Sequence, residues 1–388
     1  MKTFATAAQE AEARHLLQVY GQVAIEPTGS GGVYLHCGDR QILDLYGGHA
    51  VAALGYGHAE LLKALDDQAA ELFFQSNAVA LNVRARAADA LAGFAPTELE
   101  RVFFANSGAE ANENALRLAC RLTGRTRIAA VEHGFHGRTA GAGAVTWGAA
   151  DKWYGFPRAP FDVDFIPRDD PAAVTDCVGT DTAAVIVELV QGVAGAHDLD
   201  PAFVGAIDTA CKASGALLIV DEVQSGMGRC GGNFAADLYD VQPDLLTVAK
   251  SLGGGFPCAA LLCTQAVAAE IGNGDLGTTF GGGPLGCAMI ETVLKVINRD
   301  GLVQRAGALH ERLRAALPVG PAMSLQGKGL LAGLRCSRPA KEVQRELLAA
   351  DILAGSSADP AVLRLLPPLI LEDRHIDQFL DVLATLPD

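Results

Sequence analysis

The sequence predicts an α/β protein with a large domain built on a mostly parallel central sheet and a smaller α+β domain. Short apolar runs alternate with helical patterns through the middle of the chain. Several of these runs are continuous Val, Ile, Leu and Ala, which is typical of strands buried on both faces of a parallel sheet. Half of the 388 residues are hydrophobic, which is ample for a large core, and this length suggests two or three domains.

The elements follow in order along the chain. A helix is expected from Ser107 to about Thr123, because Ser107-Gly-Ala-Glu110 reads as a capping box and Gly124 as a stop. From about Gly286 onward helical patterns dominate. The candidate strands of the central sheet are Arg101–Ala105, Arg127–Val131, Ala183–Glu188, Ala216–Asp221 and Leu245–Val248, and those of the smaller domain are Ala332–Arg335 and Val362–Leu365.

These elements divide the chain into three parts. We expect residues 1–45 to form an N-terminal arm that contributes to the small domain. Residues 46–285 are expected to form the large domain that carries the active site. Residues 286–388 are expected to form the C-terminal small domain.

Composition excludes several classes of partner. Lys and Arg total 30 against 45 Asp and Glu, so the formal charge is −15 and nucleic acid is not an expected partner. We expect no membrane association, because no apolar run reaches the roughly 20 residues that span a bilayer and residues 1–12 lack a signal-peptide core. The nine cysteines form no Cys-x-x-Cys pair, which favours reduced thiols in a cytoplasmic enzyme.

Nearly every central strand runs into polar residues at its C-terminal end. In open α/β sheets, ligands bind outside the carboxyl ends of the strands, so these ends predict one shared site. The helix that starts after Ser107 would offer free N–H groups to an anion, although ordinary helix capping explains the same residues. The polar ends are Asn106–Ser107, His133–His136, Glu188–Gln191, Asp221–Gln224 and Lys250.

Two of these polar residues predict the cofactor. Lys250 follows a buried strand and precedes a glycine loop, a context in which burial lowers a lysine pKa and makes the amine a nucleophile and base. Asp221 ends another apolar strand. An aspartate for a pyridinium nitrogen and a Schiff-base lysine are the signature pair of pyridoxal 5′-phosphate (PLP) sites.

Rival cofactors fit the sequence less well. An ATPase would need a Gly-x4-Gly-Lys-Ser/Thr loop, and none is present. Two Gly-x-Gly-x-x-Gly matches, starting at Gly226 and Gly281, lack the strand–helix context of a dinucleotide site. His133 and His136 could ligate a metal, but no cysteine or carboxylate cluster accompanies them, so we expect no metal site.

Six motifs occur in order along the chain. They are Asn106-Ser-Gly-Ala-Glu-Ala-Asn-Glu113, Gly134-Phe-His-Gly-Arg-Thr139, Val187-Glu-Leu-Val-Gln-Gly192, Val220-Asp-Glu-Val-Gln-Ser-Gly-Met-Gly-Arg229, Ala249-Lys-Ser-Leu-Gly-Gly-Gly255 and Thr278-Thr-Phe-Gly-Gly281. With these motifs the chain resembles the class III, fold type I, PLP-dependent aminotransferases of the acetylornithine/succinylornithine group. The resemblance covers about Tyr34 to Pro368, and Asp44-Leu-Tyr-Gly-Gly-His-Ala-Val51 is similar to a subgroup acting on N-acyl-ornithines.

The resemblance implies a role for each site residue. Lys250 holds PLP as a Schiff base and moves the substrate proton, while Asp221 keeps the pyridine nitrogen protonated. Thr279 reaches the phosphate bound to the partner subunit, which implies a homodimer with shared active sites. The other implied cofactor-binding residues are Ser107, Gly108 and Ala109 at the phosphate, Phe135 and Val223 on the ring faces, Gln224 at the ring hydroxyl, and His136 and Glu188 near the ring.

The resemblance also implies substrate residues and a reaction. Arg138 would hold the α-carboxylate of an acyl-ornithine, and Arg364 that of glutamate. The family usually has Glu at Val193, where it pairs with the second arginine, and Asn at Gly283. The reaction expected is transfer of the terminal amine of N-acetyl- or N-succinyl-ornithine to 2-oxoglutarate, in arginine biosynthesis. Alternatives are transaminases for ornithine, 4-aminobutyrate or acyl-lysine, or a PLP sensor without turnover.

Overall fold

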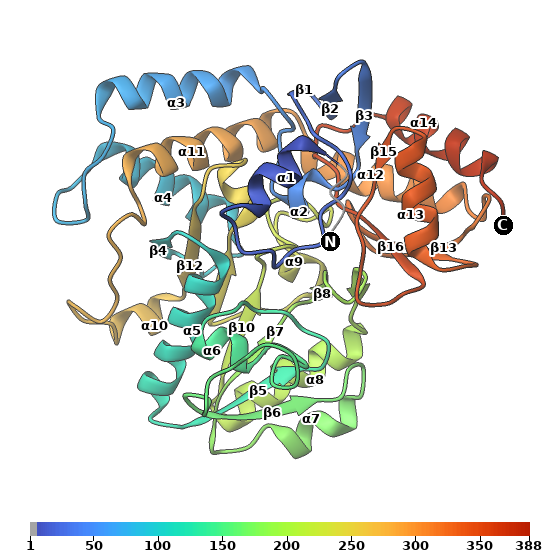
Figure 1. Ribbon diagram of the computed structural model, residues 1–388. Coiled ribbons are helices and arrows are strands. Elements are labelled where there is room, and N and C mark those ends of the chain that lie inside the picture. Colours follow the sequence, from blue (N-terminus) through green and yellow to red (C-terminus); the bar gives the residue numbers. More distant parts are fainter. Residues whose placement is uncertain (1–5) are drawn as a thin grey trace.

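A seven-stranded sheet forms the centre of the protein (Figure 1). The computed structural model describes residues 6–388, so the first five residues of the predicted arm lie outside the described part. In this sheet β12 is antiparallel to both of its neighbours, and every other adjacent pair is parallel. The strands, in spatial order, are β4 (Arg101–Ala105), β12 (Ala259–Cys263), β11 (Leu245–Val248), β10 (Leu217–Asp221), β7 (Thr182–Val187), β5 (Arg127–Val131) and β6 (Asp162–Ile166).

The mostly parallel sheet confirms the predicted fold class. All five predicted central strands are present, and the starts of β7 and β10 differ from the prediction by one residue. The prediction omitted β6 and β12. The β6 segment, Asp-Val-Asp-Phe-Ile, is a partly exposed edge strand in which polar and apolar residues alternate, so it lacks the continuous apolar run that marked the others.

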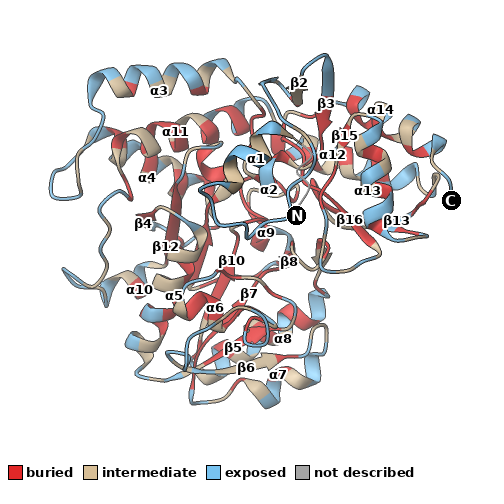
Figure 2. Cartoon of the chain, viewed as in Figure 1, coloured by how far each residue is buried: buried red, intermediate tan, exposed pale blue. Residues whose placement is uncertain are grey.

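Helices cover both faces of this sheet, and alternate residues of one strand therefore enter different hydrophobic clusters. In β7, Val185 and Val187 pack on the face covered by α7 (Pro171–Cys177) and α8 (Pro201–Ser214). Ala184 and Ile186 pack on the face covered by α5 (Gly108–Thr123). All six β7 residues are buried, as Figure 2 shows for the central strands, and this two-sided burial explains the unbroken apolar run.

A smaller antiparallel sheet and three helices form the C-terminal part of the chain (Figure 1). A separate sheet joins the N-terminal segment to the same region, because β3 pairs in parallel with β15. The boundaries 45/46 and 285/286 stay a prediction. The elements are β1 (Gly29–Gly31), β2 (Tyr34–Cys37), β3 (Arg40–Asp44), α12 (Leu302–Ala315), β13 (Ala322–Lys328), β14 (Leu331–Cys336), α13 (Ala340–Ala349), β15 (Ile352–Leu353), β16 (Val362–Leu365) and α14 (Asp373–Thr385).

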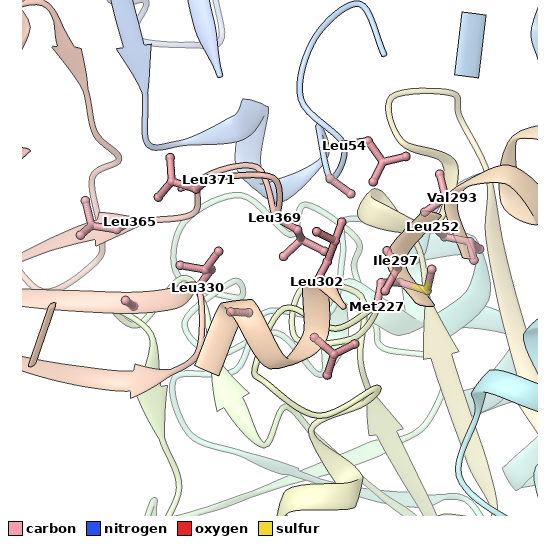
Figure 3. Close-up of a cluster of buried hydrophobic side chains, with 14 of the residues drawn as sticks. Leu54, Met227, Leu252, Val293, Ile297, Leu302, Leu330, Leu365, Leu369 and Leu371 are labelled. Atoms are coloured by element: carbon pink, nitrogen blue, oxygen red, sulfur yellow. The ribbon is translucent and has the colours of Figure 1, made fainter. Parts of the chain in front are cut away.

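One hydrophobic cluster runs from the large sheet into the C-terminal part (Figure 3). Leu252 beside the sheet, Val293 on α11 and Leu365 on β16 all belong to it. The long helix α11 also packs against α3 and α4, so it ties the two parts together. The remaining elements are α1 (Ala7–Ala13), α2 (Gly47–Ala50), α3 (Ala59–Glu71), α4 (Asn82–Phe94), α6 (Ala140–Ala144), β8 (Val190–Gln191), β9 (His197–Asp198), α9 (Ala236–Tyr239), the 3-10 turn η1 (Lys250–Gly253), α10 (Gln265–Ala269) and α11 (Pro284–Arg299).

Helix α5 begins and ends where the sequence predicts, but its capping differs in one contact. The Ser107 hydroxyl accepts the Glu110 N–H at 3.2 Å, as a capping box requires. The Glu110 carboxylate accepts the N–H of Asn106 at 2.8 Å and its side-chain amide at 2.9 Å, so the expected return contact to Ser107 is wrong. The carboxylate binds Asn106 because this residue presents two donors at the end of β4.

Within residues 6–388, no helix is long and apolar enough to cross a membrane.

Replacing either of two glycines by alanine should change the stability of the protein, in opposite directions for the two positions. Gly124 ends α5 in the left-handed region with φ 67°, whereas Gly205 lies inside α8, and neither has another atom within 4 Å of an added Cβ. We expect Gly124→Ala to destabilise the protein by about 1 kcal/mol and Gly205→Ala to stabilise it by about 0.5–1 kcal/mol. Thermal midpoints of the two variants and the parent measure this. Shifts of the same sign would contradict the assigned backbone conformations.

Candidate active site

The polar strand ends meet at one cavity of about 500 Å³. It lies at the C-terminal edge of the parallel strands, where the sequence predicts a site. All the predicted site residues line it except Thr279 and Arg364. Those that line it are Ser107, Gly108, Ala109, Phe135, His136, Arg138, Glu188, Asp221, Val223, Gln224 and Lys250.

Lys250 projects from the end of the buried strand β11. Its backbone has φ 46°, a strained conformation for a residue with a side chain, and it starts the 3-10 turn η1. The next residue secures this turn, because the Ser251 hydroxyl donates to the Ala50 carbonyl at 2.8 Å. Burial lowers the pKa of Lys250, while the carboxylates of Asp221 and Glu188 oppose this effect. A lysine of lowered pKa can act as a nucleophile and as a base.

Three donors hold the buried carboxylate of Asp221. One oxygen accepts from the Asn112 side-chain amide and from His136 Nδ1, both at 2.7 Å, and the other accepts the Val223 N–H at 3.0 Å. The residue is only 2% exposed. This carboxylate is therefore fixed in place at the wall of the cavity.

Asn112 and Thr247 extend this network, and the sequence analysis missed both. The Thr247 hydroxyl donates to the Asn112 side-chain oxygen at 2.6 Å, which turns the amide nitrogen toward Asp221. Both residues are buried. Asn112 sits in the helical pattern five residues after Ser107, and Thr247 in an apolar strand. A polar residue inside each apolar pattern was the signal available in the sequence.

His136 is part of this network. Its ring Nδ1 contacts Asp221, its backbone N–H donates to the Thr146 hydroxyl at 2.9 Å, and its ring is buried. His133 is exposed with φ 66°. Among residues 6–388, no group of three or more His, Cys, Asp or Glu is placed to hold a metal ion.

Glu188 is a second buried carboxyl beside the cavity. It accepts the N–H of Phe135 at 2.8 Å and the N–H of Gly192 at 3.3 Å. Burial, followed by the negative charge of Asp221, raises the pKa of Glu188 to about 7. Glu188 therefore anchors the loop that carries Phe135 and can hold a proton near neutral pH.

The cavity fits PLP. A Cβ at Gly108 would lie 2.7 Å from both methyls of Val223, so only glycine allows this close approach at the start of α5. That helix start offers N–H groups and a favourable dipole to a phosphate. The buried side-chain oxygen of Gln224 has no hydrogen-bond partner in the described part of the chain, which suits an acceptor for the ring hydroxyl. Together with Asp221 and Lys250, these groups suit each part of the cofactor.

The two predicted substrate arginines differ in setting. Arg138 is exposed at the cavity, with its guanidinium 4.3 Å from the Trp153 ring centre. Arg364 is 6% exposed on β16 and lies outside the cavity lining. Its guanidinium donates to the carbonyls of Ser356 and Gly192 at 2.5 and 3.1 Å. Neither arginine makes an ion pair with a carboxylate of residues 6–388 in the structure.

Thr279 and the two family departures lie elsewhere. Thr279 is exposed and away from the cavity of its own chain. Val193 is half-buried, and its carbonyl accepts the N–H of Ala358 at 2.9 Å. Gly283 precedes α11 with φ −64°, a conformation open to any residue, but an added Cβ would lie 3.0 Å from the Phe280 carbonyl oxygen.

This lysine–aspartate cavity at the strand ends defines a PLP-dependent aminotransferase, and comparisons with known proteins agree. The class-III aminotransferase model matches residues 19–386, and the chain belongs to that family. An acetylornithine aminotransferase of Methanosarcina acetivorans is 35% identical over 96% of this chain and 94% of its own. An acetylornithine/succinyldiaminopimelate aminotransferase of Yersinia pestis is 39% identical, with 94% and 93% covered.

Solved structures resemble the whole chain. The crystal structure of acetylornithine aminotransferase from Elizabethkingia anophelis superposes with a TM-score of 0.86 at 27% identity, covering 99% of this chain and 98% of its own. An ornithine aminotransferase of Toxoplasma gondii, with partial occupancy of PLP at its active site, gives 0.88 at 26% identity, covering 97% and 92%. The fold type expected from the resemblance is therefore confirmed.

The buried carboxyl of Glu222, next to Asp221, should make stability depend on pH. It accepts from the Ser225 hydroxyl and the Ala236 N–H, and burial raises its pKa from 4.5 to about 7. Because the folded state binds this proton more tightly, the stabilisation is full below about pH 4.5 and is lost as the pH rises through 7. Glu222→Gln removes this titration.

The free energy of unfolding of Glu222→Gln minus that of the parent should therefore rise between pH 5 and pH 8, by an amount on the order of 1–3 kcal/mol, and thermal midpoints across this pH range follow the change. Glu270→Gln removes the same charge from an exposed position and serves as the control. A difference that stays constant over this range would show that Glu222 does not titrate there.

Proposed function

We propose that this aminotransferase moves the terminal amine of an N-acyl-ornithine to 2-oxoglutarate in arginine biosynthesis. The observation that carries the proposal is the cavity itself, in which Lys250 faces Asp221 and Arg138 stands free of a carboxylate partner. A free guanidinium beside a catalytic amine suits an amino-acid carboxylate. The names of the relatives, acetylornithine and acetylornithine/succinyldiaminopimelate aminotransferase, point to the same substrate class.

The residues divide the work as follows. PLP supplies the carbonyl that accepts the amine and the ring that stabilises negative charge. Lys250 would bind the cofactor, and its amine would take the proton from the substrate carbon that bears the nitrogen. Asp221, held by Asn112 and His136, would keep a proton on the pyridine nitrogen. Gly108 and Ala109 would offer N–H groups to the phosphate, Phe135 and Val223 would cover the ring, and Gln224, Glu188, Ser107 and His136 would complete the pocket.

We also propose a cytoplasmic homodimer in which Thr279 reaches the phosphate bound by the partner subunit. Thr279 is exposed in the single chain and does not line its own cavity, which leaves it available to a second copy. All nine cysteines are free thiols, several of them buried, as suits a reducing compartment.

The acyl group is the least determined part of the substrate. Val193 cannot neutralise Arg364, and Arg364 has no carboxylate partner within residues 6–388. It therefore stays available to an anion, which favours succinyl over acetyl. Free ornithine should be a poor substrate because its α-amine is cationic. Transaminases for ornithine, 4-aminobutyrate or acyl-lysine are the alternatives within the family.

A panel of amine donors tests the function. N-acetylornithine and N-succinylornithine, each with 2-oxoglutarate, should be turned over at least tenfold more efficiently than ornithine, 4-aminobutyrate or acetyl-lysine, as kcat/KM reports. Lys250→Ala should abolish turnover, and borohydride reduction of the parent should label the Lys250 peptide. Preference for one of the other donors would replace the proposed substrate, and binding without turnover would indicate a sensor.

The two arginines should separate the two half-reactions. We expect Arg138→Ala to slow the acyl-ornithine half-reaction most and Arg364→Ala to slow the glutamate half-reaction most, each by about tenfold or more, because each loses a bidentate carboxylate contact. Single-turnover absorbance measurements with each donor check this. Equal losses in both half-reactions for both variants would refute the assignment.

A further inference from the structure

The turn α2 has a left-handed backbone beside the cavity. Gly47, Gly48, His49 and Ala50 have φ of 55°, 57°, 65° and 66°. Glycine adopts this conformation freely, but for the other two residues it costs roughly 1–2 kcal/mol each. Such strain persists only where the surroundings enforce it, so its position next to a cavity suggests a functional use.

Hydrogen bonds enforce the turn at both ends. The Asp44 carboxylate accepts the N–H groups of Tyr46 and Gly47 at 2.7 and 2.9 Å, and the Tyr56 hydroxyl donates to its other oxygen. At the far end, the carbonyl of Ala50 accepts from the residue that follows Lys250. The strained turn thus fixes the exposed side chain of His49 relative to the catalytic lysine.

His49 belongs to a cluster with Tyr46 and Arg364, the Tyr46–His49–Arg364 cluster. Tyr46 Oη lies 2.6 Å from His49 Nδ1, and Arg364 Nη2 donates to the same Oη at 3.3 Å. A guanidinium can only donate, so the tyrosine oxygen accepts from Arg364. In the His49 tautomer whose Nδ1 carries no proton, the tyrosine hydroxyl donates to Nδ1. A neutral His49 then carries its proton on Nε2.

The surroundings of His49 favour this neutral form. Partial burial of the ring, followed by the positive charges of Arg364 and Lys250, lowers the pKa of His49. With Nδ1 used by Tyr46, the Nε2–H is the donor that remains. His49 Nε2 has no hydrogen-bond partner among residues 6–388.

The guanidinium of Arg364 also has two N–H donors that are left for a ligand. Its Nε–H and one N–H of each terminal nitrogen are used by Ser356, Gly192 and Tyr46. One N–H on each terminal nitrogen therefore has no acceptor in the described part of the chain. The cluster thus offers donors and no free acceptor, which is the arrangement that recognises a carboxylate. It adjoins the cavity, since the N–H of Gly192 donates to Glu188, which lines the cavity.

We propose that His49 is a specificity-determining residue that donates from Nε2 to the same substrate carboxylate that Arg364 binds. Tyr46 is the positioning residue that sets the tautomer. The cluster therefore selects substrates with two carboxylates, such as glutamate and an acyl-ornithine whose acyl group ends in a carboxylate. This inference rests on the reaction proposed above and names a further determinant of its substrate.

Two variants of His49 isolate the donor. In His49→Asn the amide reaches the position of Nδ1 but not that of Nε2, and Asn tolerates a positive φ. His49→Gln restores a donor near Nε2. We expect His49→Asn to raise KM for L-glutamate and N-succinylornithine about tenfold, whereas the KM for N-acetylornithine at saturating 2-oxoglutarate should change by much less. His49→Gln should recover most of the loss, and Tyr46→Phe should raise the same two KM values less than His49→Asn does.

Glutarate binding provides a measurement that does not depend on turnover. Its calorimetric Kd should rise about tenfold in His49→Asn and return toward the parent value in His49→Gln, while thermal midpoints show that both variants fold. Equal KM changes for all three donors, no change for any donor, or an unchanged glutarate Kd would overturn the inference. If the parent turns over neither acyl-ornithine, the proposed function fails, whereas the glutarate result still decides the role of His49.

Discussion

The buried carboxylate of Asp221 is the interaction on which the rest of the site depends. A carboxylate taken out of water is costly unless donors surround it. Here the donors come from three places in the chain: Asn112 on α5, His136 after β5, and the N–H of Val223. Satisfying one charge therefore aligns the helix that offers N–H groups to a phosphate with the loop that carries Phe135.

The cavity also brings together a basic group and an acidic group, and burial disfavours the charged form of each. Burial lowers the pKa of Lys250 and raises the pKa of Glu188 to about 7, and each group opposes the shift of the other. The two shifts therefore bring the pKa of the amine and the pKa of the carboxyl closer together. The surrounding sheet contributes to the burial behind both shifts, because its strands are buried on both faces.

How far the sequence predicts the structure depends on how far apart along the chain the interacting residues lie. Continuous apolar runs such as β7 and β11 depend on local composition, and they were predicted within one residue. The polar residues at their ends follow from the same register. Asn112 and Thr247 form their hydrogen bond across 135 residues, and no local pattern reports a contact of that separation. The return contact of Glu110 was also misplaced, because Asn106 and Ser107 compete for it and only the geometry at the end of β4 decides.

The two arginines show a second limit of sequence reasoning, because they stand in very different surroundings. Arg138 is exposed over the face of Trp153, a contact that holds a guanidinium loosely, so it can follow carboxylates in different positions. Arg364 is buried and bound to two carbonyls and to Tyr46, so it can receive a carboxylate in one orientation only. A motif identifies both residues as arginine but does not distinguish these settings. Because the rigid arginine sits beside the strained turn of His49, the strictest selection should act on the carboxylate bound there, and the adaptable arginine leaves room for variation at the other end of the substrate.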